Sequence, residues 1–186
     1  MSKNLIWGII IGIVLVGGVY TLVKTPFKSS KLAGLEFIVY KTPTCGCCEE
    51  YVGYLRMNGA NVKVNEVSDE ELTKIKTQHN IPQTLWSCHT VLITQNYAEL
   101  TQNLQNNADN NIRVNLRNNP RESAYFIEGH IPIEAISKLL TEKPDINGIV
   151  LPGMPSGSPG MPGIKFYPFK IHSVKDGKDQ GLFIEI

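Results

Sequence analysis

The stretch that decides the fold is Glu36-Phe-Ile-Val-Tyr-Lys-Thr-Pro-Thr-Cys-Gly-Cys-Cys48, in which an apolar run leads into three cysteines. The apolar run predicts a buried strand over residues 36–40. A helix is expected to follow the cysteines as far as about Asn58, because Val52 and Leu55 lie three positions apart and Gly59 can end it. The cysteines therefore lie where a strand passes into a helix.

The segments that follow show strand and helix patterns in turn. They predict a strand over 61–67, a helix from Ser68 to before Pro82, strands over 91–94 and 124–127, and a helix from Pro132. The second helix begins with the capping box Ser68-Asp-Glu-Glu71 and is expected to bury Leu72 and Ile75. This order predicts an α/β fold of the thioredoxin-like type, in which helices flank a central mixed sheet.

Three segments extend this minimal pattern. Residues 96–119 form an Asn-rich insertion, with nine Asn among 24 residues, and residues 112–116 alternate as a strand does. The insertion is either a partner-binding flap or a surface elaboration. Residues 151–163 contain Pro-Gly-Met-Pro twice, which predicts an ordered loop. Residues 166–186 predict a terminal hairpin that turns at Asp176-Gly177.

The N-terminus predicts a membrane anchor. Residues 5–23 are 19 apolar or uncharged residues, which at about 1.5 Å per residue just span a hydrocarbon core. A cleaved signal peptide is the rival interpretation, but Val19-Tyr-Thr-Leu22 offers no small-residue cleavage site. We expect an N-terminal transmembrane helix within residues 1–24, a linker over 25–34 and one domain over 35–186. The lysines on both sides of the helix do not settle its orientation.

The charge balance excludes one class of function. The chain has 18 basic and 17 acidic side chains and a formal net charge of +1. Such a chain has no net field to attract a phosphate backbone, so nucleic acid is not an expected partner.

All four cysteines fall in two places, Cys45-Gly-Cys-Cys48 and Ser87-Cys88-His89-Thr90. The first cluster is expected at a helix N-terminus, where free N–H groups and the helix dipole stabilise thiolates. Cys88 precedes a strand that should start beside this cluster in the expected fold. We therefore predict that the four sulfur atoms converge.

Converging thiols allow three kinds of chemistry. Cys45 and Cys48 have the C-x-x-C spacing of thiol–disulfide exchange, with Cys45 as nucleophile and Cys48 as resolving thiol, although Cys47 would compete. Four cysteines could also hold zinc in a structural module, but zinc sites usually draw on two separated pairs. Crowded thiolates suit bridging between several soft ions, and copper(I) is the first candidate.

Two histidines and two methionines are weaker candidates for the same site. His89 follows Cys88, and His130 lies in the loop before the last helix, so either could be a ligand or orient one. Met154 and Met161 are soft thioether donors in the Gly/Pro-rich loop, where a packing role is the alternative.

The chain closely resembles a bacterial family of small periplasmic proteins catalogued as a domain of unknown function, which includes CopG-like copper-resistance proteins. The resemblance rests on four ordered motifs: Val39-Tyr-Lys-Thr-Pro-Thr-Cys-Gly-Cys-Cys48, Ser87-Cys-His-Thr90, Ile127-Glu-Gly-His-Ile-Pro132 and Val150-Leu-Pro-Gly-Met-Pro-Ser-Gly-Ser-Pro-Gly-Met161. His89 and His130 match the signature, without a defined role. The Asn-rich insertion is a departure from the family pattern.

The resemblance implies a thioredoxin-like domain that faces the periplasm and binds copper through Cys45, Cys47, Cys48 and Cys88. It also implies a role in copper resistance, with interconversion of copper(I) and copper(II). We therefore expect a copper-binding protein anchored in the inner membrane, with copper ions and a periplasmic copper-handling protein as partners. The protein would be an enzyme if it acts as a copper oxidoreductase, and the sequence alone does not decide this. Thiol–disulfide exchange and a zinc-stabilised module are the alternatives.

Overall fold

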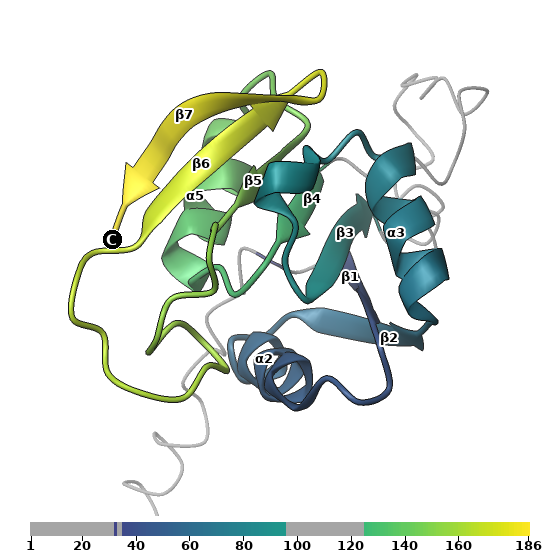
Figure 1. Ribbon diagram of the computed structural model, residues 1–186. Coiled ribbons are helices and arrows are strands. Elements are labelled where there is room, and N and C mark those ends of the chain that lie inside the picture. Colours follow the sequence, from purple (N-terminus) through teal and green to yellow (C-terminus); the bar gives the residue numbers. More distant parts are fainter. Residues whose placement is uncertain (1–31, 33–34, 96–124) are drawn as a thin grey trace, which may run out of the picture.

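Seven strands form one mixed sheet and three α-helices pack on it in the residues that the computed structural model describes, which are 32, 35–95 and 125–186 (Figure 1). In chain order the elements are β1 (Leu35–Lys41), α2 (Gly46–Met57), β2 (Asn61–Glu66), α3 (Asp69–Gln78), the 3-10 turn η1 (Gln83–Leu85), β3 (His89–Gln95), β4 (Tyr125–Glu128), α5 (Ile133–Glu142), β5 (Gly148–Val150), β6 (Lys170–Lys175) and β7 (Lys178–Glu185). The predicted α/β class and the predicted order of elements as far as α5 are confirmed.

The sheet order is β2-β1-β3-β4-β5-β6-β7. β1 pairs in parallel with β2 and antiparallel with β3, and the register places Lys41, at the end of β1, opposite His89, at the start of β3. β4 pairs antiparallel with β3, and its last residue, Glu128, lies opposite Thr90. Three segments therefore meet at the same end of these central strands: the cysteine cluster after β1, Cys88 before β3 and the turn after β4.

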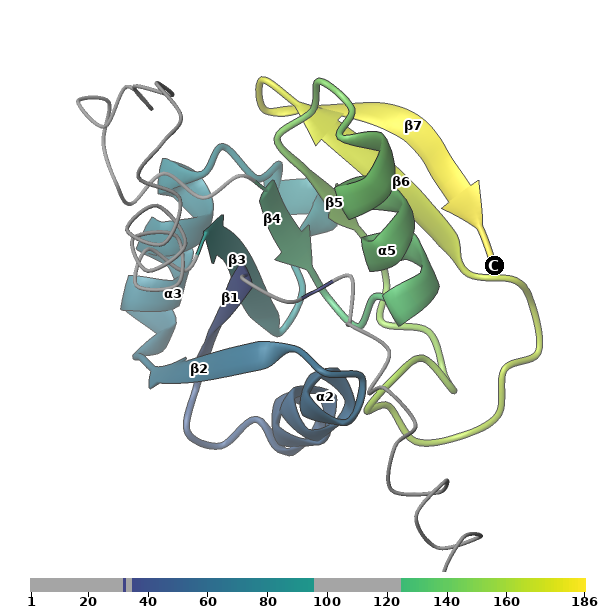
Figure 2. The same cartoon turned by 180° about the vertical axis from the view of Figure 1, so that it is seen from behind.

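Alternate residues of the central strands face two separate apolar cores, as strand geometry requires. α2 and α5 cover the larger core, which includes Phe37, Val39, Tyr51, Val52, Leu55, Val91, Ile93, Ile127, Ile136, Leu139 and Ile149. The other face is covered by the segment from α3 through η1, and its core comprises Ile81, Leu85, Leu92, Phe126, Val150 and Val174. Figures 1 and 2 show α3 and α5 on opposite sides of the sheet.

Two predicted helix boundaries have a structural cause, the end of α2 and the start of α3. α2 ends in a Schellman motif, because Gly59 N–H donates to Arg56 O and Ala60 N–H donates to Leu55 O. α3 begins where Ser68 Oγ accepts the N–H of Glu71 at 3.2 Å, which confirms the predicted helix start and is one of the two hydrogen bonds of a capping box.

One buried position of α3 differs from the prediction. Leu72 is buried as expected, but Ile75 is only half-buried, and Lys76 is buried instead with 3% of its surface exposed. Lys76 lies four residues after Leu72 and therefore on the same helix face. Its ammonium group has a buried carboxylate partner, Glu128.

The C-terminal third contains one strand that the sequence pattern did not predict. β5 has three residues, all buried, and pairs in parallel with β4. The terminal hairpin is confirmed as β6 and β7, which turn at Asp176-Gly177. Residues 151–163 contain no helix or strand, as expected for an ordered loop.

Several predicted features fall outside the described residues. These are the membrane anchor over residues 5–23, all of the linker except Leu32, and the Asn-rich insertion over 96–119. Within the ranges that the structure does describe, no helix combines the length and the apolar character needed to cross a membrane.

Candidate metal centre

The four cysteines meet at the N-terminus of α2. Cys45 is the N-cap residue of α2, Cys47 and Cys48 lie in its first turn, and Cys88 directly precedes β3. The four Sγ atoms all lie within 4.8 Å of one another. Cys47 Sγ is 3.7 Å from Cys45 Sγ and 3.9 Å from Cys88 Sγ. The predicted convergence of the four sulfur atoms is therefore confirmed.

Cys45 and Cys48 are joined in a disulfide, whereas Cys47 and Cys88 are free thiols. Cys48 is fully buried, and its Sγ lies 3.7 Å from the Cys88 carbonyl oxygen. The other three cysteines are half-buried. Only the reduced form, with the disulfide opened to two thiols, can offer all four sulfurs as thiolate ligands.

Cys88 lies at the centre of the site. Burial, and then the neighbouring Cys47, raise the pKa of the Cys88 thiol to about 12. The thiol is therefore protonated at neutral pH in the disulfide form. A metal ion that binds Cys88 must displace this proton, so metal uptake at this position releases H⁺.

His130 presents one ring nitrogen to Cys88. Its Nδ1 lies 2.7 Å from the carbonyl oxygen of Pro159, which can only accept, so Nδ1 carries the proton. Nε2 is then the acceptor nitrogen, and the thiol of Cys88 can donate to it, with Sγ at 3.2 Å. Burial lowers the pKa of His130, which favours the neutral form. Metal-binding histidines are typically oriented in this way.

His89 is packed more deeply. Its Nδ1 lies 3.4 Å from Cys88 Sγ, and its side chain is fully buried. Burial first, and then electrostatic repulsion of an added proton by the nearby His130 and Lys76, hold the pKa of His89 well below its usual value. Both predicted histidines therefore lie beside Cys88, and Cys88, His89 and His130 form a second group of potential ligands.

Tyr51 supports the two histidines and was not singled out from the sequence. Its ring centroid lies 4.7 Å from that of His89 and 5.3 Å from that of His130, and its hydroxyl donates to Ile131 O at 2.9 Å. Burial raises the pKa of Tyr51, so it is a neutral hydrogen-bond donor. The available signal was its spacing, since Tyr51 follows Cys48 by three residues on the buried face of α2.

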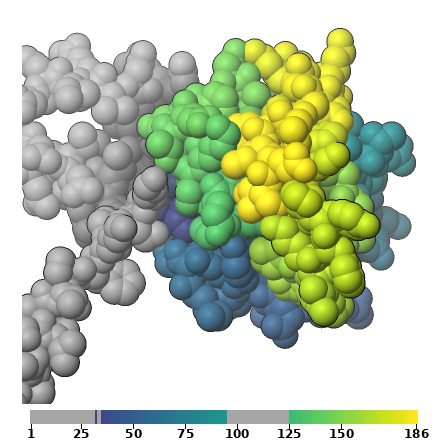
Figure 3. Space-filling model, turned by 90° about the vertical axis from the view of Figure 1, so that its left-hand side faces the viewer, coloured from purple at the N-terminus to yellow at the C-terminus, as the bar shows by residue number. Residues whose placement is uncertain are grey.

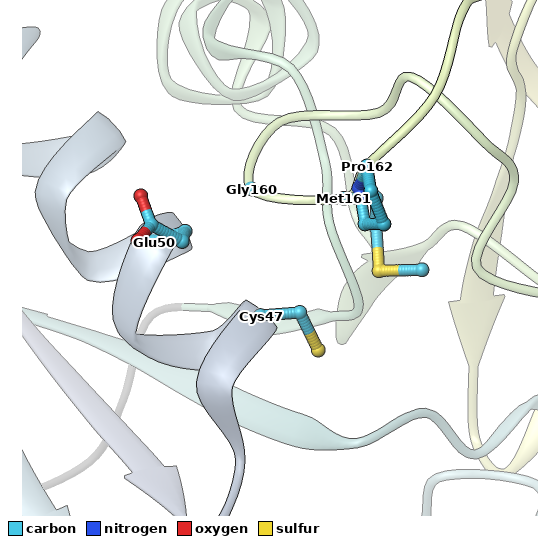
Figure 4. A pocket seen from close by; sticks show the side chains of 5 residues that line it. All are labelled: Cys47, Glu50, Gly160, Met161 and Pro162. Carbon is cyan, nitrogen blue, oxygen red and sulfur yellow. The ribbon is translucent and has the colours of Figure 1, made fainter.

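The Gly/Pro-rich loop covers one side of the cysteine cluster. Figure 3 shows its yellow-green atoms at the surface, next to the yellow terminal hairpin. Between this loop and α2 lies an open pocket of about 540 Å³, lined by Cys47, Glu50, Gly160, Met161 and Pro162. In Figure 4 the side chains of Cys47 and Met161 point to the same side of the pocket, and Glu50 points away from them.

The two methionines of this loop have different positions. Met161 is half-buried and lines the pocket beside Cys47. Met154 does not line this pocket, and 37% of its surface is exposed. The structure therefore places one of the two thioether candidates at the cysteine site.

Comparisons with known proteins relate the chain to one family model and to two solved structures. Residues 122–161, which include His130 and Met161, match the model of the family "Protein of unknown function, DUF411". Two solved structures, named "Copper resistance protein copG", Form 1 and Form 2, are 27% identical to the chain. Each match covers 82% of this chain and 98% of the other, with TM-scores of 0.59 for Form 1 and 0.58 for Form 2. No curated protein matches the chain significantly. The resemblance to CopG-like copper-resistance proteins of a family of unknown function is confirmed.

Proposed function

We propose, starting from the resemblance to CopG-like copper-resistance proteins, that the chain contributes to copper resistance by binding copper(I) as cargo through Cys45, Cys47, Cys48 and Cys88. The observation that carries this proposal is the convergence of the four sulfur atoms within 4.8 Å of one another. Thiolates are soft ligands and select copper(I) over hard cations. The N-terminus of α2 adds free N–H groups and a partial positive charge, which stabilise the negatively charged sulfurs.

The crowding of the sulfurs supports a multinuclear site over a single zinc ion. Three of the four ligands come from four consecutive residues, and Cys47 Sγ lies 3.7 Å from Cys45 Sγ and 3.9 Å from Cys88 Sγ. A sulfur in this position can bridge two soft ions, whereas a structural zinc site needs four ligands spread tetrahedrally around one ion. Zinc stays the alternative metal.

The histidines and Met161 would complete the donor set. His130 Nε2 is aimed at Cys88 by the hydrogen bond from Nδ1 to Pro159, so it can act as a ligand to a metal bound by Cys88. Met161 lines the same pocket as Cys47, and its thioether sulfur can supply a neutral soft donor there. His89 would either bind the same metal or orient Cys88. For Met154, the exposed position favours a role outside the site.

Interconversion of copper(I) and copper(II) is the finer part of the proposal. Two copper(II) ions would take up the two electrons released when the Cys45 and Cys48 thiolates join in a disulfide. Two external thiols would reduce the disulfide again and would themselves leave as a disulfide, which restores the four-thiol form. The Cys45–Cys48 disulfide of the structure supports the view that these two cysteines can store two electrons.

The same disulfide favours a second candidate function, thiol–disulfide exchange. Cys45 is at the N-cap position of α2 and half-buried, whereas Cys48 is fully buried, as expected for an attacking and a resolving thiol. In this alternative Cys47 and Cys88 have no required role. The two functions therefore differ in what they need from Cys47 and Cys88.

We also propose a thioredoxin-like domain that a membrane helix holds at the periplasmic face of the inner membrane. The order β1-α2-β2-α3-β3-β4-α5, with the C-x-x-C pair at the start of α2, supports the fold type. The 19 residues from Leu5 to Val23 support the anchor. The anchor would be wrong if the full chain is recovered in the soluble fraction when membranes are washed with carbonate.

A copper(I) titration of the full chain in detergent, without oxygen and against a chromogenic copper(I) chelator, tests the proposed function. The thiol-reduced chain is expected to bind several copper ions and to hold them against the chelator. The chain with the Cys45–Cys48 disulfide is expected to bind fewer and to bind them at least about tenfold more weakly, because two sulfurs are lost. Equal and weak binding by both forms would contradict a thiolate site.

A further inference from the structure

A buried ion pair lies directly behind Cys88. Lys76, from α3, has 3% of its surface exposed, and Glu128, at the end of β4, has none. Their side chains form a salt bridge. Lys76 Nζ also donates to Thr90 Oγ1 at 2.9 Å. Removing two charges from water is costly, and apolar residues of similar volume often stabilise a fold as well or better. Stability alone therefore does not explain why the chain buries this ion pair.

The Glu128 carboxylate binds the chain on both sides of Cys88-His89. One oxygen accepts the backbone N–H of Ser87 at 2.5 Å. The other accepts the hydroxyl of Thr90 at 2.7 Å. The two contacts fix the residue before Cys88 and the residue after His89, so the dipeptide between them has little freedom to move.

The turn that follows Glu128 reaches the same segment from a second direction. Gly129 has φ +85°, and a Cβ there would lie 3.0 Å from Ser87 Oγ and 3.1 Å from Leu151 O. Next along the chain, His130 brings Nε2 to 3.2 Å from Cys88 Sγ. Glu128 and His130 therefore hold Cys88 from one rigid turn, which fixes the sulfur relative to its nitrogen neighbour.

We propose that Glu128, paired with Lys76, is a positioning residue that holds Cys88 Sγ in place for the metal centre. The inference rests on the proposed function, because it assigns a role in binding copper(I). Glu128 touches no sulfur of the site itself, and it acts through the backbone N–H of Ser87 and the hydroxyl of Thr90. Residues that orient metal ligands in this way commonly change metal affinity by about 10- to 100-fold when replaced.

Paired substitutions separate the positioning role from the buried charge. A single substitution would leave one charge buried without a partner, which is strongly destabilising and can prevent folding. Lys76→Met with Glu128→Gln removes both charges but keeps an amide oxygen for Ser87 N–H and an amide N–H for Thr90. Lys76→Met with Glu128→Leu removes both charges and both hydrogen bonds. The two double variants have similar volumes, and thermal unfolding by circular dichroism checks that each is folded.

Copper(I) affinity of the full chain in detergent is the first readout. The Lys76→Met, Glu128→Gln variant, called the Gln pair, is expected to keep a copper(I) affinity within about threefold of the unmodified chain. The Lys76→Met, Glu128→Leu variant, called the Leu pair, is expected to bind copper(I) at least about tenfold more weakly. In a Cys88→Ser background the two pairs should bind equally, because the positioned sulfur is gone. If the Leu pair binds as tightly as the unmodified chain, or if its loss persists in the Cys88→Ser background, the positioning role is wrong.

The second readout needs no copper. In the reduced, copper-free chain, iodoacetamide is expected to alkylate Cys88 several-fold faster in the Leu pair than in the Gln pair, with Cys47 unchanged, as mass spectrometry of peptides would show. Equal rates at Cys88 would overturn the positioning role. If the unmodified chain binds no copper(I) tightly while Cys88 alkylation still differs, the proposed function fails and the positioning of Cys88 stands.

Discussion

Replacement of Cys88 by Ser is expected to lower the number of copper(I) ions held by the reduced full chain and to weaken those that remain by about tenfold or more. Cys88 is the sulfur that connects the two groups of ligands, since its Sγ lies 3.9 Å from Cys47 Sγ and 3.2 Å from His130 Nε2. A hydroxyl is a harder donor than a thiolate and binds copper(I) poorly. Bound copper is counted per chain after separation from a competing chelator.

Two further variants serve as a control and as a test between copper binding and thiol exchange. Met154→Leu changes a soft donor that does not line the pocket and should leave the copper count unchanged. Cys47→Ser should lower copper binding as Cys88→Ser does, while the reduction and reoxidation of Cys45–Cys48 should survive it. If copper binding is unchanged in both Cys→Ser variants and thiol exchange is intact, copper binding by the cysteines is wrong and thiol–disulfide exchange is the function of the site.

Replacement of Gly160 by Ala is expected to detach the Gly/Pro-rich loop from α2. Gly160 has φ +79°, and a Cβ there would lie 2.7 Å from Tyr51 N and 2.8 Å from Cys47 O, which are backbone atoms that cannot move aside easily. The carbonyl oxygen of Pro159, the preceding residue, accepts a hydrogen bond from His130 Nδ1. Displacement of the loop should therefore release His130 and weaken copper(I) binding by about tenfold, as loss of an orienting contact does.

Gly153→Ala is the matched control. Gly153 lies in the same loop with φ +76°, but a Cβ there meets nothing within 4 Å. Gly153→Ala is expected to cost only backbone strain of about 1–3 kcal/mol. Gly160→Ala carries the same strain and adds the clash with α2. Thermal unfolding should show the larger loss of stability for Gly160→Ala, and only that variant should lose copper affinity. Equal behaviour of the two variants would show that contact with α2 does not hold the loop.

The sequence predicted the part of the site that depends on local pattern. The apolar run before Cys45 and the capping box at Ser68 determine β1 and the start of α3, and the strand-to-helix transition places three cysteines at a helix N-terminus. Cys88 was expected beside them because, in a thioredoxin-like fold, the loop before the third strand faces the active cysteines, and the sulfur–sulfur distances confirm its position. Such features follow from periodicity and capping, which neighbouring residues determine.

The residues that sequence reasoning missed depend on tertiary partners. Lys76 is a charged helix residue that would normally face solvent, and its burial follows from a carboxylate 52 positions away, at Glu128. β5 has three residues without alternation, so its pattern does not differ from that of a buried loop. Met154 and Met161 each lie in a Pro-Gly-Met-Pro sequence, and only the packing of the loop on α2 distinguishes their positions.

X-ray absorption at the copper edge of the reduced, copper-loaded chain tests the thiolate copper(I) site most directly, because it reports the oxidation state, the ligand atoms and neighbouring metals together. We expect a copper(I) edge, a first shell made mainly of sulfur and scattering from a second copper ion, with the sulfur shell reduced in Cys88→Ser. A first shell of nitrogen and oxygen alone, unchanged by Cys88→Ser, would contradict copper binding by the four cysteines.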